Sequence, residues 1–335
     1  MRVFAKLIAT AGLGMFLVAA ATVPGADAQG KDKAVLLLNW YNYGEHAPFY
    51  LGLAKGYFAE ENIDLEIQEG RGSGITVQAV AAGSAAFGYA DTGTMIKAAA
   101  KGAPVKAVGV LLQRSPMAVM GFAERNIAAP ADIKGKTVAV TPGDSLSQLW
   151  PVFLRLNNLS DKDFKTITGD ATTKRNAVVN GQADLLLGNA NDQKPIIEEA
   201  TGKSVRALLF ADSGVNTLNA GIIVQKDLIQ KNPDLIRRFM RAATRAVEAT
   251  AQAPDEAVAA MLKINAKAGK PETLRKSLDI TLPLYHTVAT ATRRPFDCDP
   301  KDMATTLDML AQYGGVDPSS KGRPEDYYTL EFLPK

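Results

Sequence analysis

The sequence is poor in the residues that build covalent and metal sites. Its 335 residues include one cysteine, Cys298, and two histidines, His46 and His286. A single cysteine excludes an intramolecular disulfide framework and a cysteine-cluster metal site. The two histidines lie far apart in the sequence, so no ligand spacing supports a histidine metal centre. We therefore expect neither a metal nor a cofactor.

Positive and negative side chains are nearly balanced in number. Lysine and arginine number 38 and aspartate and glutamate 35, which gives a formal net charge of +3. A nucleic-acid-binding protein would carry a concentrated basic face instead. The composition thus predicts no nucleic-acid partner.

Long apolar runs are absent outside the amino terminus. Arg2 and Lys6 precede a mostly apolar stretch, 7–21, which is too short for a stable transmembrane helix, and no later stretch approaches the ~20 residues needed to span a bilayer. Ala26 and Ala28 supply small residues at the two positions that a signal peptidase recognises. We predict a signal peptide, 1–28, cleaved after Ala28, and a periplasmic location. No cysteine follows the run, so a lipoprotein anchor is not expected.

The remaining residues, 29–335, exceed what one hydrophobic core usually holds, so two lobes are expected. A polar break with proline at 113–116 separates two apolar runs, and a second polar segment at 212–219 precedes another. We interpret both as crossings between lobes. The predicted division is a discontinuous first lobe, 29–115 plus 220–335, and a second lobe, 116–219. We expect a monomer.

The segment 34–58 predicts the first part of a binding site. An apolar strand, 34–38, leads into an aromatic turn and then into a helix that begins near Pro48. In an open α/β sheet, ligands collect at the carboxyl ends of strands. The candidate ligand-binding residues in this turn are Trp40, Asn42, Tyr43 and His46. The alternative is that the aromatic rings are core residues and His46 a turn residue.

An internal repeat predicts further site residues. Gln78–Asp91 and Asn176–Asn189 each read as a helix end, a glycine, an apolar strand and a short polar residue. Two lobes built on one plan would bring Asp91 and Asn189 to opposite walls of one cleft. A glycine-rich turn before the first repeat adds Ser73, and because no Gly-Lys-Ser/Thr follows, this turn is not a phosphate loop.

Two predicted helix starts, at Thr92 and Ser145, offer backbone donors to an electron-rich ligand group. Trp150 lies about one turn into the second helix, where it could stack on a ligand ring or serve as a core residue. Asp91 could equally be only a helix cap. A later helix capped by Asn232 carries four arginines opposite its apolar face, which indicates a solvated face or, alternatively, a surface that docks on a membrane permease.

Several motifs resemble one family. Leu38-Asn39-Trp40, His46 and Lys55-Gly56-Tyr57-Phe58 are similar to the opening of a family that joins bacterial ABC-transporter binding proteins for sulfonates, taurine, nitrate and thiamine pyrimidine precursors to the fungal thiamine-pyrimidine synthase. The run from Asp132 to Val140 with Pro142-Gly143-Asp144-Ser145 resembles the start of that family's second lobe. The resemblance implies an α/β, type II periplasmic-binding-protein fold, in which two lobes, each a mixed sheet flanked by helices, enclose a ligand cleft.

The same resemblance bears on catalysis. The synthase carries a lysine that holds pyridoxal phosphate and a histidine one turn later, and the matching positions here are Ala90 and Thr94. Its cysteine-rich cluster matches 215–219, which contains no cysteine. These departures remove the chemistry, so we expect a binding protein and not an enzyme.

The resemblance implies a solute-binding component that delivers a small molecule to an ABC permease in the inner membrane. The favoured ligand is a heteroaromatic such as a thiamine pyrimidine precursor, held between Trp40, Tyr43 and Trp150. The alternatives are an oxyanion ligand (a sulfonate, taurine or nitrate), a synthase-like enzyme, an exported enzyme that uses Asp91 and His46, and a binding protein that presents its ligand to a receptor.

Overall fold

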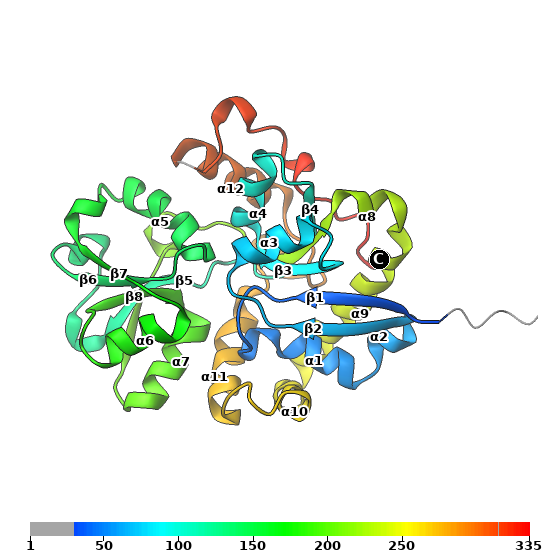
Figure 1. Ribbon diagram of the computed structural model, residues 1–335, viewed down its shortest axis with the longest axis horizontal. Coiled ribbons are helices and arrows are strands. Elements are labelled where there is room, and N and C mark those ends of the chain that lie inside the picture. The colour runs from blue at the N-terminus through cyan, green and yellow to red at the C-terminus, as the bar shows by residue number, and fades with distance from the viewer. Residues whose placement is uncertain (1–29, 314) are drawn as a thin grey trace, which may run out of the picture. The chain divides into compact units, whose positions relative to one another are not determined.

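The strands of the chain assemble into two separate five-stranded sheets (Figure 1). The computed structural model describes residues 30–313 and 315–335, so the predicted signal peptide lies outside the described residues. Residues 31–335 form one compact unit. No helix in this described part is long and apolar enough to cross a membrane.

The first sheet has the strand order β2-β1-β3-β10-β4. β1 runs parallel to β2 and β3, whereas β10 is antiparallel to both β3 and β4. Its strands are β1 (Asp32–Leu37), β2 (Ile63–Gln68), β3 (Phe87–Asp91), β4 (Val105–Val110) and β10 (Ala220–Gln225). The helices that come before and after these strands in the chain are α1 (Ala47–Ala54), α2 (Tyr57–Glu60), α3 (Ser73–Ala81), α4 (Thr92–Ala100), α8 (Lys226–Lys231), α9 (Pro233–Gln252), α10 (Pro254–Ile264), α11 (Pro271–Thr281) and α12 (Pro300–Tyr313).

The second sheet repeats this plan with the order β7-β6-β8-β5-β9. Its strands are β5 (Met117–Phe122), β6 (Thr137–Val140), β7 (Lys165–Thr168), β8 (Leu185–Asn189) and β9 (Val205–Leu209), and its helices are α5 (Ser145–Leu156), α6 (Ala171–Val179) and α7 (Ala190–Thr201). β6 is parallel to its two neighbours, and β5 is antiparallel to both of its own. The repeated sequence segments end in β3 and β8, each the third strand of its sheet.

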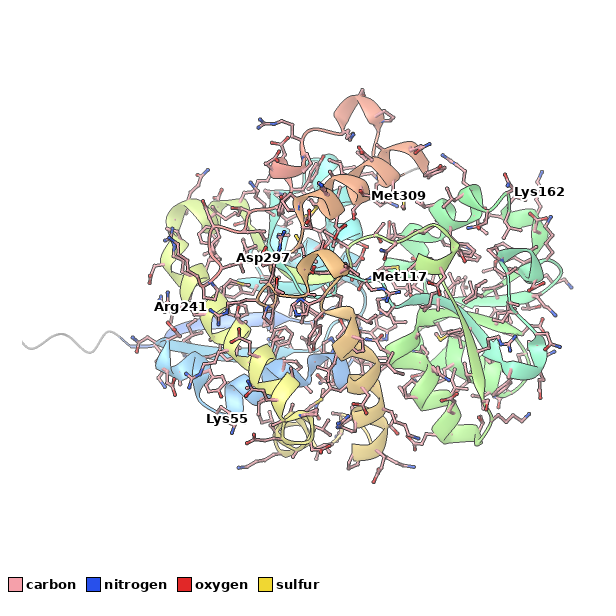
Figure 2. All side chains as sticks on the ribbon, turned by 180° about the vertical axis from the view of Figure 1, so that it is seen from behind. Lys55, Met117, Lys162, Arg241, Asp297 and Met309 are labelled. Carbon is pink, nitrogen blue, oxygen red and sulfur yellow. The ribbon has the colours of Figure 1, made fainter. Side chains whose placement is uncertain are left out.

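The chain passes from the first sheet to the second between β4 and β5, where Met117 begins β5, and returns between β9 and β10 (Figure 2). Both crossings lie at the boundaries of the predicted division, 29–115 plus 220–335 and 116–219, which we retain as a proposal. We refer to these two parts as the first and the second lobe.

The long helix α9 forms for the reasons that its sequence suggests. The Asn232 side chain accepts a hydrogen bond from the Leu235 amide at 3.1 Å, and proline occupies the first helical position. Its apolar face is buried, and Phe239 stacks on Phe87 of β3 with ring centroids 3.8 Å apart. Burial of such side chains, each stabilising by roughly 1.5–3 kcal/mol, fixes α9 on the first sheet.

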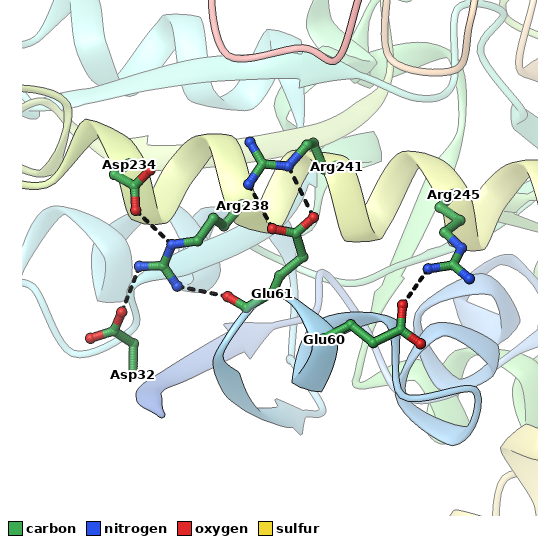
Figure 3. A network of polar contacts seen from close by, with 7 residues as sticks. All are labelled: Asp32, Glu60, Glu61, Asp234, Arg238, Arg241 and Arg245. Carbon is green, nitrogen blue, oxygen red and sulfur yellow. Dashed lines mark hydrogen bonds and ion pairs between the residues drawn. The ribbon is translucent and has the colours of Figure 1, made fainter. Parts of the chain in front are cut away.

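The opposite face of α9 is engaged within the first lobe. Arg238 pairs with Asp234 and with Asp32 of β1, while Arg241 and Arg245 pair with acidic residues at the end of α2 (Figure 3). Exposed pairs of this kind contribute about 0–1 kcal/mol each. Their geometry accounts for these arginines without a partner protein, and permease docking at this face stays a prediction.

Candidate functional site

A pocket lies where the carboxyl ends of strands from both sheets meet. It contains about 310 Å³ of space, counting the solvent at its mouth. The segments that follow β1 and β2 form one wall, and the end of β8 with the segments that follow β6, β7 and β8 forms the other. The pocket is lined by Asn39, Trp40, Gly72, Ser73, Asp144, Ser145, Leu146, Lys174, Gly188, Asn189 and Asp192. Four of the ten predicted site residues are therefore brought together here.

Trp40 supplies the aromatic surface of the pocket. It lies in the loop that follows β1, and it is half-buried. The Lys174 ammonium of the second lobe lies 5.3 Å from the centroid of the ring, a cation–π distance. Trp40 thus contacts both lobes and presents a flat face to anything held between them.

The other predicted residues of the opening loop lie outside the lining of the pocket. His46 is fully buried, and its Nε2 lies 2.8 Å from Oδ1 of Asn39, which lines the pocket. Burial lowers the pKa of His46 to about 3, so its ring is neutral near pH 7. Tyr43 donates to Glu45 at 2.7 Å, and Asn42 donates to Glu69 at 2.5 Å. None of the three lines this pocket.

Ser73 lines the pocket, whereas Asp91 and Thr92 do not. The Ser73 hydroxyl oxygen accepts a hydrogen bond from the Asp91 amide at 3.1 Å. The Asp91 carboxylate accepts from the amide and the hydroxyl of Thr94, at 2.6 and 2.7 Å, and so caps α4. Thr92 donates to the Asn219 carbonyl at 2.6 Å. Burial raises the pKa of Asp91 to about 6.

The helices α4 and α5 each begin with a carboxylate cap. Asp91 caps α4, and Asp144 caps α5 by accepting from the Ser147 amide at 2.7 Å. Because each positive helix end already holds a carboxylate of the chain, an anionic ligand is disfavoured there, and the role of Thr92 and Ser145 as backbone donors stays a prediction. Ser145 still lines the pocket with its own atoms.

Trp150 lies in the aromatic core of the second lobe. Its ring stacks with Phe153 and Phe210 at centroid distances of 5.0 and 5.8 Å and meets Phe164 edge-on. It does not line the pocket, and neither does Tyr43. Of the three rings expected to sandwich the ligand, the structure places only Trp40 at the pocket.

Asn189 ends β8 and lines the pocket. Its side-chain oxygen is buried and has no hydrogen-bond partner among the described residues. Burial raises the pKa of Tyr43 well above its usual range, and the Asn189 side chain is the one group that opposes this rise. An unpaired buried acceptor costs free energy, so this oxygen is suited to a donor on a ligand.

The charged residues of the pocket were not predicted from the sequence. Lys174 and Asp144 are both buried and form an ion pair with 3.2 Å between Nζ and Oδ2. Asp192 is also buried, and burial raises its pKa. The position of Asp144 before a helix was a usable signal for a cap, but no local pattern marks Lys174, which meets its partner only after folding.

The lobes touch each other around the pocket. Tyr41 of the first lobe donates to Asp192 of the second at 2.6 Å, and Asn191 donates to the buried Glu45 at 2.7 Å. Gly74 and Gly143 face one another so closely that a Cβ on Gly74 would lie 2.9 Å from the Gly143 carbonyl oxygen. This arrangement corresponds to a closed form of the two lobes.

The pocket is equipped for binding. It offers an aromatic face, an unpaired amide oxygen and two carboxylates, while its one lining ammonium is already paired with Asp144. The described residues contain no group of three or more histidine, cysteine or acidic side chains placed to hold a metal ion. Two lobes that face a shared pocket with the carboxyl ends of their sheets define the class as the periplasmic-binding-protein fold.

The chain belongs to the NMT1/THI5-like family, which it matches over residues 43–257. It is 29% identical over 253 residues to the riboflavin-binding protein RibY of Chloroflexus aurantiacus, covering 74% of this chain and 71% of that protein. It is 26% identical over 276 residues to the formylaminopyrimidine-binding protein of Halalkalibacterium halodurans, covering 80% of this chain and 82% of that protein.

An enzyme by name is among the relatives. The 4-amino-5-hydroxymethyl-2-methylpyrimidine phosphate synthase of Legionella pneumophila is 26% identical over 257 residues, covering 76% of this chain and 80% of that protein. The nitrate-binding protein NrtA of Synechocystis aligns in structure with a TM-score of 0.68 at 14% identity, over 90% of this chain and 87% of that one. This structural similarity confirms the predicted two-lobe α/β fold of periplasmic binding proteins.

Proposed function

We propose that this protein is the exported solute-binding component of an ABC importer and that it captures an uncharged, nitrogen-containing heteroaromatic ring. The lobes close on the ring, and the closed form delivers it to a membrane permease. Relatives named for riboflavin and formylaminopyrimidine binding support this ligand class. The signal peptide predicted at 1–28 supports a periplasmic location.

One observation carries the choice of ligand. Asn189, whose side-chain oxygen has no hydrogen-bond partner among the described residues, and Trp40 line the same pocket. A planar ring with an N–H or amino group can stack on Trp40 and donate to Asn189 at the same time. Nitrate and simple sulfonates have neither a ring face nor a donor for these two residues.

The charges of the pocket favour the same ligand. Asp144 and Asp192 place two carboxylates in the wall, and Lys174 is committed to Asp144 and to the face of Trp40. An anion would enter a site of net negative character and would have to displace an existing buried pair, which is costly. The oxyanion alternative is therefore the weaker proposal.

A synthase function is weaker as well. At the positions that match the synthase lysine and histidine, Ala90 lies in β3 and Thr94 is hydrogen-bonded to Asp91. Neither side chain offers an amine or an imidazole. We therefore propose binding without turnover, although some relatives carry a synthase name.

A thermal-shift panel on residues 29–335 tests the proposal. Uncharged pyrimidines and flavins should raise the melting temperature, since a ligand at about 100 times its dissociation constant stabilises the native state by ~2.7 kcal/mol. Nitrate and alkanesulfonates should not. The Asn189→Leu variant, which keeps the size of the side chain but lacks the acceptor, should lose most of the shift. A shift with the oxyanions alone would refute the heteroaromatic ligand while leaving the fold intact.

A further inference from the structure

Lys174 of α6 is a buried cation in the wall of the pocket. Its side chain is only 2% exposed, and it lines the pocket together with Trp40, Asp144 and Asn189. Lysine is almost never fully buried unless it is paired, because a buried ammonium loses its hydration. The groups around the Lys174 ammonium therefore have to replace the water that it has lost.

The protein supplies only part of that replacement. An ammonium carries three N–H donors. Among the described residues it forms one hydrogen bond, to Oδ2 of Asp144 at 3.2 Å. Its other contact is with the Trp40 ring, whose centroid lies 5.3 Å from Nζ. Even if the ring engages a second N–H, at least one N–H has no acceptor among the described residues and is available to a ligand.

The ammonium lies where it can meet the edge of a ring stacked on Trp40. Stacked rings prefer an offset arrangement with their centroids about 4.5–7 Å apart. The distance of 5.3 Å between the Lys174 Nζ and the Trp40 centroid falls in that range. A ligand ring stacked with an offset on Trp40 therefore lies in the same layer as the ammonium and presents its edge to it.

A neutral acceptor suits this ammonium better than an anion does. Asp144 already balances the charge of Lys174, and Asp192 adds a second carboxylate to the lining of the pocket. A ring nitrogen or a carbonyl oxygen can accept the available N–H and leave the ion pair intact. An anion would instead compete with Asp144 for the ammonium.

We propose that Lys174 is a specificity-determining residue, which donates a hydrogen bond to an acceptor on the ligand ring held at Trp40. The inference rests on the proposed function and narrows its ligand class to rings that donate to Asn189 and accept from Lys174. A ring without an acceptor would leave a buried N–H of Lys174 unpaired, and the pocket selects against it for that reason.

Two small rings that differ in their acceptors test this role. 4-Amino-2-methylpyrimidine and 3-methylaniline share a ring size, an amino group and a methyl group, and only the pyrimidine has ring nitrogens that accept hydrogen bonds. Calorimetric titration of residues 29–335, at a pH where both compounds are uncharged, gives a dissociation constant for each. The pyrimidine should bind more tightly by about fivefold or more, although its ring nitrogens are the more costly to remove from water.

Removal of the ammonium should abolish this preference. Lys174→Met alone would leave Asp144 buried without its cation, so the double variant Lys174→Met/Asp144→Asn removes both charges, and asparagine remains a suitable cap for α5. In this variant the pyrimidine should bind more weakly by about fivefold or more, while 3-methylaniline stays within about twofold. Lys162→Met, a change at an exposed lysine of the second lobe (Figure 2), should affect neither compound.

The role of Lys174 is refuted, with the proposed function intact, if the parent binds 3-methylaniline as tightly as the pyrimidine. It is also refuted if the double variant keeps the preference of the parent or weakens both compounds equally. If the parent binds flavins but neither small ring, the double variant should weaken riboflavin binding by the same factor, and an unchanged affinity would refute the role. Failure of the parent to bind both small rings and every compound of the thermal-shift panel would overturn the proposed function and the role of Lys174 with it.

Discussion

Trp40 and Trp150 are the only two tryptophans of the chain, and their surroundings are opposite. Trp40 is half-buried at the pocket, whereas Trp150 is packed among phenylalanines. Trp40→Ala should weaken ligand binding by about 1–3 kcal/mol, because it removes the stacking face and the partner of Lys174. Trp150→Phe should lower the melting temperature and leave affinity within about twofold. In Trp150→Phe the remaining tryptophan reports binding directly, so an unchanged fluorescence on saturation would contradict the assignment of Trp40.

Asp91 makes stability depend on pH. Its pKa rises from 3.8 to about 6 on folding because the carboxyl is buried. The native state thus binds this proton more tightly than the unfolded state, and the free energy of unfolding falls as pH rises from about 4 to about 6, by roughly 3 kcal/mol at full effect. Asp91→Asn keeps the cap and should remove this part of the pH dependence, as measured by urea unfolding at a series of pH values.

Asp170 provides a control of opposite sign. It caps α6 from an exposed position, and backbone hydrogen bonds lower its pKa. Its contribution to stability is therefore present at neutral pH and is lost as pH falls. Asp170→Asn should lose stability relative to the parent as pH rises, the reverse of Asp91→Asn. Parallel pH profiles for both variants would contradict the burial of Asp91.

Single residues were predictable where a local pattern fixes their role. Asp91 and Asn232 precede helices and serve as caps, as their positions suggested. Asn189 could be placed at a strand end because the repeat points to it. Lys174 and Asp192 could not, since their burial depends on contacts across 30 residues with Asp144 and between lobes with Tyr41. Trp150 shows that residue type alone does not separate a ligand platform from a core ring.

At the scale of elements, most helices and strands were predictable from the periodicity of apolar residues and from the glycine, proline and capping residues at their ends. The predicted strand 34–38 corresponds to β1, which ends at Leu37, and the helix predicted to begin near Pro48 corresponds to α1, which begins at Ala47. The sequence predicts a glycine-rich turn at Ser73, because Gly72-Ser73-Gly74 has the composition of a turn, whereas α3 begins at Ser73. In the structure these residues form the helix start that approaches Gly143 of the second lobe.

This close approach predicts the effect of one methyl group. Gly74 lies in α3, where alanine is favoured over glycine by roughly 0.5–1 kcal/mol, so Gly74→Ala should not destabilise the open protein. In the closed form the added Cβ would lie 2.9 Å from the Gly143 carbonyl oxygen. Ligand affinity in calorimetric titration should fall by about 5- to 150-fold.

Gly93→Ala is the matched control for this prediction. Gly93 lies in α4, and a Cβ there would meet its neighbours at 3.4 Å or more, an ordinary contact. Its affinity should remain close to that of the parent. If Gly74→Ala also binds normally, the lobes do not close to the separation described.

At the scale of the whole molecule, the proposed function depends on closure of the two lobes. Asn191 of the second lobe donates to both Glu45 and Thr281 of the first, at 2.7 and 2.8 Å, and all three side chains are buried. Asn191→Ala would remove one donor from each of these acceptors in the closed form only, which costs about 1–3 kcal/mol, although Tyr43 still donates to Glu45. Small-angle scattering should show that the variant needs more ligand to become compact, whereas Lys194→Ala should not, because the Lys194 side chain contacts Glu198 and Val205 of its own lobe. Equal ligand requirements would contradict this role of Asn191.

The central claim is that the closed lobes hold an uncharged heteroaromatic ring and release it unchanged. Equilibrium dialysis of residues 29–335 against riboflavin and an aminopyrimidine, followed by mass spectrometry of the bound fraction, tests it most directly. The account predicts one molecule bound per chain, with its mass unaltered after prolonged incubation, and no binding of nitrate under the same conditions. A bound compound of altered mass, or saturation by nitrate alone, would contradict it.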